Sequence, residues 1–232
     1  MKRLLTTVPF ALLIIFLASC AGQEKAATRP VPEYIDDINQ NTFLVIDDIK
    51  ETKAGVGNIK LPEWLTAFFI GGIDEVEKMT PYNDKYSFVI INQGKNFGAL
   101  NKWADNYSVT HDFPRMAAAR IEKRLVSEEL YQDAAYGIFF ERLIKKTFSA
   151  EYTSALVEDT YWIKSRVNKD SAAGGIDEAE EIYEFFIFIS VDKASMQKDV
   201  FNMMTETLSA VTLKRSQKKT INRLQQTFFE GF

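Results

Sequence analysis

The strongest pattern of apolar and polar positions in the chain lies in residues 182–191. Five large apolar side chains alternate along one face of this segment: Tyr183, Phe185, Ile187, Ile189 and Val191. Spacing with a period of two is typical of a β-strand, and Phe186 and Phe188 on the opposite face favour a strand that is covered on both sides. Residues 160–167 alternate in the same way, so we predict that they pair with 182–191 as an antiparallel hairpin. The polar segment 168–181 is then the connecting loop.

Two weaker strand patterns and several helical patterns surround this hairpin. Residues 42–49 and 86–93 are the additional strand candidates. A helix is expected to begin at Pro62, a residue suited to a first helical turn, and Gly71 and Gly72 are expected to interrupt it. The remaining short or C-terminal helices are predicted at 96–103, along the apolar stripe Met196, Val200, Met203, Met204, Leu208 and Val211, and at 217–229.

The longest predicted helix begins after Asp112, the expected N-cap, and has Pro114 just inside it. It is expected to continue over residues 131–148. Apolar residues of this second part recur at helical spacing and are expected on one face: Ala134, Ala135, Ile138, Phe139 and Leu143.

The order of these elements indicates an α/β or α+β fold. Helices lie between the strands, and at least one strand pair is an antiparallel hairpin, so we expect several amphipathic helices to cover a small mixed sheet. No linker divides the chain after residue 32, and residues 33–232 are therefore predicted to be a single globular domain.

The first 19 residues have the composition of an export signal. Lys2 and Arg3 precede an apolar run over 8–18 that ends in small residues. This run is shorter than the roughly 20 apolar residues of a transmembrane helix. We predict a signal peptide over 1–19 that is removed after export, with an uncleaved N-terminal anchor as the alternative.

The sequence Leu17-Ala18-Ser19-Cys20 at the end of this run resembles the lipobox of bacterial lipoproteins. The resemblance covers the first 22 residues and implies that Cys20 carries a lipid on its thiol and begins the mature chain. Cys20 is the only cysteine, which suits an exported protein that uses its thiol for lipid rather than for a disulfide. Residues 20–32 are then the lipidated cysteine and an extended tether.

Charge and histidine content narrow the possible chemistry. The formal net charge of −4 becomes −6 when Lys2 and Arg3 leave with the signal peptide, and an acidic chain is poorly suited to nucleic acid. His111 is the only histidine, so the chain lacks the ligands of a zinc site. A Ser-His-Asp arrangement would need His111 beside Asp112, and a surface histidine in a helix-entry turn is the favoured interpretation.

Acidic residues are numerous, but no motif assigns them a role. Pairs occur at Asp36-Asp37, Asp47-Asp48 and Glu180-Glu181, and Asp177 and Glu178 extend the last pair into a cluster. This cluster is either a solvated loop or a weak cation site. The EF-hand spacing and the glycine-rich phosphate loops are absent from the sequence, so we expect no metal and no cofactor.

One clear basic cluster lies near the C-terminus: Lys214, Arg215, Lys218, Lys219 and Arg223. On a tethered protein these residues could contact an anionic surface, namely lipid headgroups or peptidoglycan carboxylates. The alternative is a solvated helix face.

Aromatic residues make up 13% of the chain, and Met196, Met203 and Met204 share one helical stripe. Thioethers adapt to irregular partners, so the stripe could line a groove for an apolar or lipid-like ligand. Ordinary core packing is the favoured interpretation.

A second resemblance covers most of residues 61–204. Pro62-Glu63-Trp64, the helix Met116–Arg124, Tyr161-Trp162 and Val191-Asp192-Lys193 occur in an order similar to uncharacterised small envelope lipoproteins of Gram-negative and spirochaetal type. The resemblance implies an envelope location and brings no catalytic residues.

Together these patterns predict a non-enzymatic lipoprotein held on the periplasmic face of a membrane by the lipid on Cys20. Ala21 rather than aspartate follows the cysteine, which favours the outer membrane. We expect a structural or assembly role, with an envelope protein as a further partner and an oligomeric state that the sequence leaves open. The alternatives are a module that binds an apolar or lipid-like ligand, and a hydrolase that uses two carboxylates to cleave envelope glycans.

Overall fold

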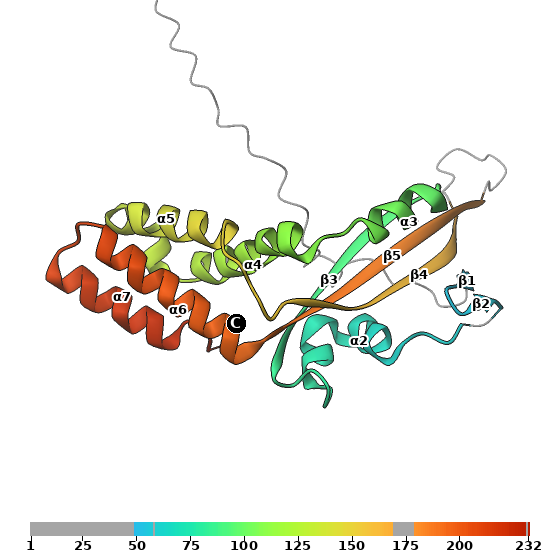
Figure 1. The fold of residues 1–232 in the computed structure, drawn as a ribbon, viewed down its shortest axis with the longest axis horizontal. Helices are drawn as coiled ribbons and strands as arrows, with labels where there is room; N and C mark the ends of the chain where they lie inside the picture. The colour runs from blue at the N-terminus through green and yellow to red at the C-terminus, as the bar shows by residue number, and fades with distance from the viewer. Residues whose placement is uncertain (1–48, 58, 169–178, 231) are drawn as a thin grey trace, which may run out of the picture. The chain divides into compact units, whose positions relative to one another are not determined.

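The computed structural model contains a five-stranded antiparallel sheet (Figure 1). The structure describes residues 49–57, 59–168, 179–230 and 232. The strand order is β2-β1-β4-β5-β3. The strands are β1 (Ile49–Thr52), β2 (Gly55–Val56), β3 (Lys85–Gly94), β4 (Leu156–Asn168) and β5 (Ala179–Asp192).

The inner strand β5 contributes to two separate hydrophobic cores. Ile187, Ile189 and Val191 belong to the larger core, which includes Tyr86 and Phe88 of β3. The alternate residues Phe186 and Phe188 belong to the smaller core on the opposite face. The period-two pattern of residues 182–191 therefore arises because β5 is covered on both faces.

The described part of the chain has six α-helices: α2 (Glu63–Lys78), α3 (Phe97–Asp105), α4 (Val109–Val126), α5 (Gly137–Phe148), α6 (Lys193–Ala210) and α7 (Arg215–Thr227). Helix α2 closes the smaller core, where the rings of Trp64 and Phe188 stack with centroids 4.9 Å apart. Helix α3 lies on the face of the sheet opposite to α2, where the ring centroids of Phe97 and Phe185 are 5.4 Å apart.

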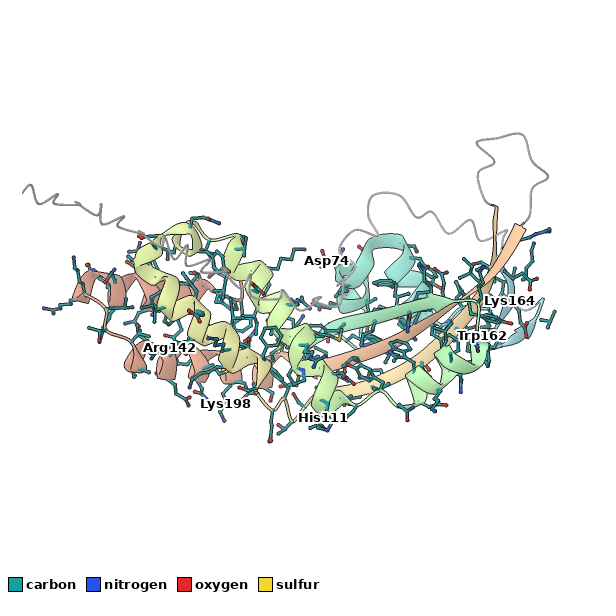
Figure 2. The ribbon with its side chains drawn as sticks, turned by 90° about the horizontal axis from the view of Figure 1, so that it is seen from above. Asp74, His111, Arg142, Trp162, Lys164 and Lys198 are labelled. Atoms are coloured by element: carbon teal, nitrogen blue, oxygen red, sulfur yellow. The ribbon has the colours of Figure 1, made fainter. Side chains whose placement is uncertain are left out.

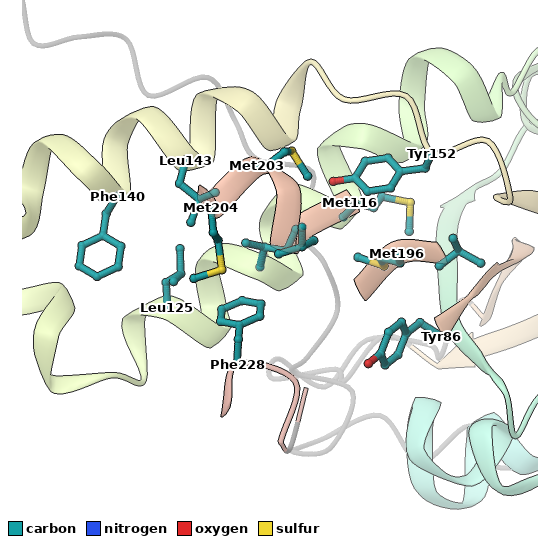
Figure 3. Packing of buried hydrophobic residues seen from close by; sticks show 14 of the residues in the cluster. Tyr86, Met116, Leu125, Phe140, Leu143, Tyr152, Met196, Met203, Met204 and Phe228 are labelled. Carbon is teal, nitrogen blue, oxygen red and sulfur yellow. The ribbon is translucent and has the colours of Figure 1, made fainter. Parts of the chain in front are cut away.

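Helices α4 to α7 pack against one another at one end of the sheet (Figure 1). Figure 2 shows Arg142 of α5 and Lys198 of α6 at this end, and Trp162 and Lys164 of β4 at the other. The larger core fills the space between these helices (Figure 3). It includes Leu125, Leu143, Met204 and Phe228, all of which are buried.

The structure confirms the predicted fold class and the hairpin. Strands β4 and β5 pair antiparallel, with Ile163 opposite Glu184 and Tyr161 opposite Phe186. The expected mixed pairing is replaced by antiparallel pairing between all the described strands. The hairpin loop is shorter than expected, because Asn168 pairs with Ala179 and both belong to strands. The predicted strand 86–93 is confirmed, whereas 42–48 of the candidate 42–49 lie outside the described residues.

Several helix boundaries differ from the prediction. Helix α7 spans Arg215–Thr227 rather than 217–229. The helix assigned to begin after Asp112 begins at Val109, and Ser108 is its N-cap. The Asp112 carboxylate instead accepts a hydrogen bond from the Ser108 backbone N–H at 3.0 Å, which places Asp112 inside the first turns. The helix expected over 131–148 begins as an α-helix only at Gly137, after two 3₁₀ turns.

The apolar face predicted for this second helix is partly wrong. Phe139 and Leu143 are buried, but Ala134, Ala135 and Ile138 are exposed. Phe140 and Thr147 complete the buried face in their place. The interruption of α2 is confirmed, since Gly71 and Gly72 have non-helical backbone angles inside it.

Candidate functional site

The basic cluster predicted from the sequence lies on the exposed side of α7. We call it the α7 basic face, and it consists of Lys214, Arg215, Lys218, Lys219 and Arg223. All five side chains are exposed. None of them forms an ion pair within the described part of the chain, so their charges are available to an outside group.

The local sequence explains why these cations are exposed. Ile221 and Leu224 are buried on one side of α7, and Phe228 continues that side beyond the last turn. Arg215, Lys219 and Arg223 lie away from this buried side, and Lys214 and Lys218 lie along its border. The Gln217 side chain accepts a hydrogen bond from the Lys214 backbone N–H at 2.8 Å and satisfies a donor at the start of the helix. No aspartate or glutamate occurs over residues 211–229, so no acidic side chain neutralises the basic residues from within the helix.

Several other lysines and arginines of the described residues pair with carboxylates. Lys145 pairs with Glu141 at 2.6 Å on α5, and Lys146 pairs with Glu206 across α5 and α6. Since α7 has no such pairs, the α7 basic face is a concentration of positive charge on a chain whose formal net charge is −4.

An exposed aromatic ring lies beside α7. Phe201 of α6 is 48% exposed, and it is the one large apolar side chain exposed over residues 193–227. The Gln225 amide of α7 donates hydrogen bonds to the Phe201 carbonyl oxygen at 2.9 Å and to Thr205 Oγ1 at 2.6 Å. These two bonds fix the position of Phe201 relative to α7.

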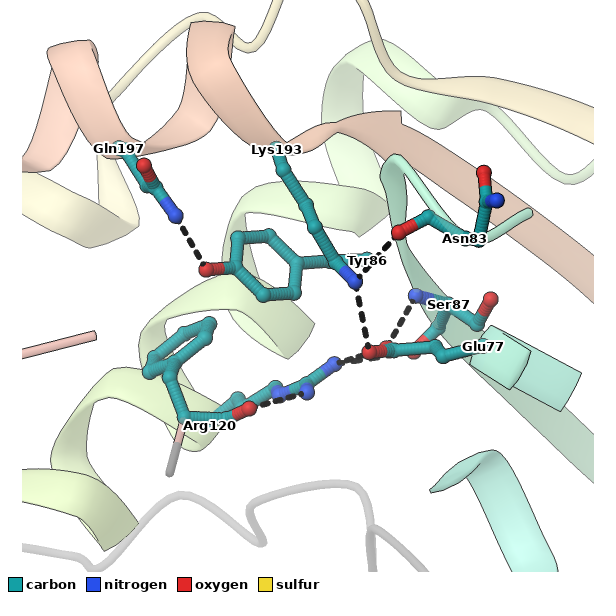
Figure 4. Close-up of polar contacts among 8 residues, drawn as sticks. Glu77, Asn83, Tyr86, Ser87, Arg120, Lys193 and Gln197 are labelled. Carbon is teal, nitrogen blue, oxygen red and sulfur yellow. Dashed lines mark hydrogen bonds and ion pairs between the residues drawn. The ribbon is translucent and has the colours of Figure 1, made fainter. Parts of the chain in front are cut away.

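A second cluster of charged residues is internal and joins four elements (Figure 4). Arg120 of α4 donates a hydrogen bond to Glu77 of α2 at 3.1 Å, and both side chains are only 12% exposed. Glu77 also accepts from the Ser87 backbone N–H of β3 at 2.7 Å, and Arg120 donates to the Ser87 carbonyl oxygen at 3.1 Å. Lys193 Nζ at the start of α6 lies 3.7 Å from the same Glu77 carboxylate.

Aromatic rings surround the Arg120 guanidinium. It lies 4.8 Å from the Phe232 ring centroid and 5.1 Å from that of Tyr86. Gln197 donates a hydrogen bond to the Tyr86 hydroxyl at 2.8 Å, and burial raises the pKa of Tyr86. Because the polar groups of this cluster are used in contacts between elements, we assign it a structural role.

A third polar cluster lies at the start of β4, where the register of β4 against β5 shifts between Val157 and Asp159. Glu158 accepts hydrogen bonds from Lys85 Nζ at 2.6 Å and from the Ser190 hydroxyl. Burial alone would raise the pKa of Glu158, but these two hydrogen bonds and the charge of Lys85 hold it below its ordinary value. The neighbouring Asp159 accepts a hydrogen bond from Trp64 Nε1 at 3.0 Å.

One carboxylate oxygen of the sheet is buried without a hydrogen-bond partner among the described residues. Glu184 of β5 lies between Ile163 and Gln93 of the adjacent strands, and its Oε2 atom is buried without a hydrogen bond in the described structure. Burial raises the pKa of this carboxyl group.

The remaining residues considered from the sequence are dispersed. His111 is exposed in the first turn of α4, as predicted, and its neighbour Asp112 binds backbone rather than the imidazole. Glu181 pairs with Lys164 at 2.6 Å. Cys20, Asp36-Asp37, Asp47-Asp48, Asp177 and Glu178 lie outside the described residues. Within the described ranges, no three His, Cys, Asp or Glu side chains are grouped as metal ligands.

The methionines of the apolar stripe are part of the larger core. Met196, Met203 and Met204 are buried on α6, where they pack with residues of α4, α5 and α7 (Figure 3). The prediction that this stripe is core is therefore confirmed.

Comparisons with protein families, with curated proteins and with solved structures find no match to this chain. Among the helices of the described residues, none combines the length and the apolar character that crossing a membrane requires. The sequence did not indicate the Glu77–Arg120 cluster or the exposed ring of Phe201. Arg120 could have been noticed as a cation directly before Ile121 in an apolar stripe, but its partner is 43 residues away in the sequence.

Proposed function

We propose that this protein is a lipid-anchored protein of the bacterial cell envelope that acts by binding an anionic partner rather than by catalysis. The observation that carries this proposal is the α7 basic face, with its five exposed cations and no carboxylate partner among the described residues. Binding of an anion by these residues breaks no existing ion pair. The attraction therefore meets little opposing cost beyond side-chain ordering and partial desolvation.

The proposed anchor rests on the sequence around Cys20. A cationic start, an apolar run and Leu17-Ala18-Ser19-Cys20 support export and lipidation of the thiol. We place the protein on the periplasmic side of the outer membrane, because Ala21 follows the cysteine. An envelope protein remains a proposed further partner.

Structural observations favour this proposal over the two alternatives. The methionines that would line an apolar groove are buried against other core residues, which weighs against a ligand-binding module. The half-buried or buried carboxylates Glu77 and Glu158 are bound to cations of neighbouring elements, which weighs against their use in glycan hydrolysis.

The anchor is tested in bacteria that express the full chain and its Cys20→Ala variant. We expect metabolic labelling with an alkyne fatty acid to mark the parent protein and not the variant. The variant should also move from the membrane fraction to the supernatant. His111→Ala, a change at an exposed residue, is the control and should label like the parent. A Cys20→Ala protein that still labels and still sediments would show that Cys20 is not the anchor.

The binding face is tested on the mature chain, residues 20–232, which contains every described helix and strand. The parent should be retained on a polyglutamate matrix and should elute with salt. Lys218→Gln/Lys219→Gln/Arg223→Gln should elute earlier, whereas Lys50→Gln/Lys102→Gln/Arg115→Gln should elute near the parent. Equal elution of the two triple variants would contradict the assignment of the binding face to α7.

A further inference from the structure

We infer that the α7 basic face and the ring of Phe201 form one surface that lies on an anionic lipid bilayer. This inference rests on the proposed function, since it names the partner of the same face. It adds a second contact, the exposed ring, and assigns the bilayer surface rather than a soluble anionic macromolecule as the partner.

Hydrogen bonds between α6 and α7 place the backbone of Phe201 beside the C-terminal half of the helix that carries the cations. Gln225 follows Lys218 by seven residues and Lys214 by eleven, so the three side chains lie along one stripe of a helix with about 3.6 residues per turn. The Gln225 amide binds the Phe201 carbonyl oxygen at 2.9 Å. Phe201 therefore adjoins the end of a stripe that begins with two of the five basic residues.

This combination of groups suits the boundary between headgroups and acyl chains. Lysine and arginine side chains attract anionic headgroups, and an exposed aromatic ring gains free energy by leaving water for the interfacial layer. A soluble polyanion offers the first of these interactions but no apolar layer for the ring. The half-exposed Phe201 is thus the observation that distinguishes a bilayer from other anionic partners.

The proposed anchor leaves α7 within reach of the membrane. Cys20 and the first described residue, Ile49, are 29 positions apart. A chain of this length spans at most about 100 Å when fully extended. A bilayer contact through α7 would orient the folded domain against the membrane that holds its lipid.

Vesicle binding by the mature chain, residues 20–232 with Cys20→Ser, tests the inference without any contribution from the lipid. Vesicles of equal parts phosphatidylglycerol and phosphatidylcholine are compared with vesicles of phosphatidylcholine alone, at about 0.1 M and about 1 M salt. We expect co-sedimentation with the anionic vesicles at low salt, and little with the neutral vesicles or at high salt.

Variants assign the binding to the two parts of the surface. Each cation near an anionic surface contributes roughly a 5-fold change in binding, so Lys218→Gln/Lys219→Gln/Arg223→Gln should bind about 100-fold more weakly. Glutamine matches lysine and arginine in helix propensity, so α7 should remain folded. The control Lys50→Gln/Lys102→Gln/Arg115→Gln changes the net charge equally and should bind much more tightly than the α7 variant.

The ring is tested with Phe201→Ser, and Ile70→Ser on α2 is its control, since Ile70 is 77% exposed. Phe201→Ser should weaken vesicle binding several-fold and leave retention on polyglutamate unchanged, whereas Ile70→Ser should change neither. Equal binding to anionic and neutral vesicles, or an unchanged affinity of Phe201→Ser for vesicles, would overturn the inference. If the parent is retained on polyglutamate but does not bind anionic vesicles, the bilayer inference alone is overturned. If the parent binds neither, the proposed binding function is overturned as well.

Discussion

Arg120 and Glu77 join helices α4 and α2 through a hydrogen-bonded ion pair of 3.1 Å that is nearly closed to solvent. The same two side chains bind the backbone of Ser87 on β3: Arg120 donates to its carbonyl oxygen and Glu77 accepts from its N–H. Both backbone groups point away from β5, at the outer edge of the sheet. Part of this edge is thus satisfied by side chains from two helices rather than by another strand.

Removal of one member of this pair should strongly destabilise the fold. Arg120→Met removes the guanidinium that binds both the Glu77 carboxylate and the Ser87 carbonyl oxygen, and we expect the free energy of unfolding to fall by about 3–5 kcal/mol. Urea denaturation measures this change. Arg115→Met on the same helix is the exposed control, with an expected effect within about 0.5 kcal/mol. A loss for Arg120→Met that is no larger than the control would contradict the role of the pair.

Acidification should weaken the fold through Glu158. Its folded-state pKa lies below the ordinary 4.5. The unfolded chain therefore binds the proton more readily, and stability is lost as the pH falls from about 4.5 through the lowered pKa. Urea midpoints of the parent and of Glu158→Gln should differ most at neutral pH and converge in acid. A difference that persists unchanged below the folded-state pKa would exclude this linkage.

Glu184 should have the opposite effect on the pH dependence. Because burial raises its pKa above 4.5, the folded chain holds the proton more tightly, and the Glu184 contribution becomes less favourable as the pH rises from about 4.5 through the raised pKa. Glu184→Gln should therefore be more stable than the parent at neutral pH and similar to it in acid. Thermal unfolding at both pH values checks this, and a variant less stable at neutral pH would refute it.

Two buried tyrosines should respond oppositely to loss of the hydroxyl group. The Tyr152 hydroxyl is buried without a hydrogen-bond partner among the described residues, and burial raises its pKa. Tyr152→Phe should raise the free energy of unfolding by about 1 kcal/mol, because it removes an unsatisfied polar group. Tyr86→Phe loses the bond from Gln197 and should lower it by a similar amount. Chemical denaturation distinguishes these signs, and equal losses would contradict the assignment.

The kink in α2 should depend on Gly72. Its backbone angles, φ 70° and ψ −156°, lie in a region that residues other than glycine rarely adopt. Gly72→Ala should cost about 1–3 kcal/mol in urea unfolding. Gly137→Ala is the matched control, since Gly137 has helical angles and open space where the new methyl group would lie. A tolerated alanine at position 72 would mean that the kink is adjustable.

The sequence predicted best the elements whose apolar pattern follows directly from burial in a hydrophobic core. The period of two in residues 182–191 persists because both faces of β5 are buried, and the stripe of α6 persists because it packs into a single core. The N-cap of α4 was assigned wrongly because Ser108 and Asp112 are both residues that favour caps, and only the fold shows which one begins the helix.

The candidate surface could be predicted in part. Its five cations are close in sequence, so their clustering on a helix follows from spacing alone, but their lack of carboxylate partners depends on the packing of α5 and α6. Phe201 could not be selected in advance. Position 201 lies outside the predicted apolar stripe of α6, but the sequence alone did not show that no other element covers its side chain.

The alternation along β5 also bears on how the protein denatures. Phe186 and Phe188 form a wall of one core, while Ile187 and Ile189 form a wall of the other. Neither core can open fully without disturbing the strand that the other requires. We therefore expect the two sides of the sheet to unfold together in one cooperative transition. The fluorescence of Trp64, measured in a Trp103→Phe/Trp162→Phe variant, and helical circular dichroism should then report the same midpoint.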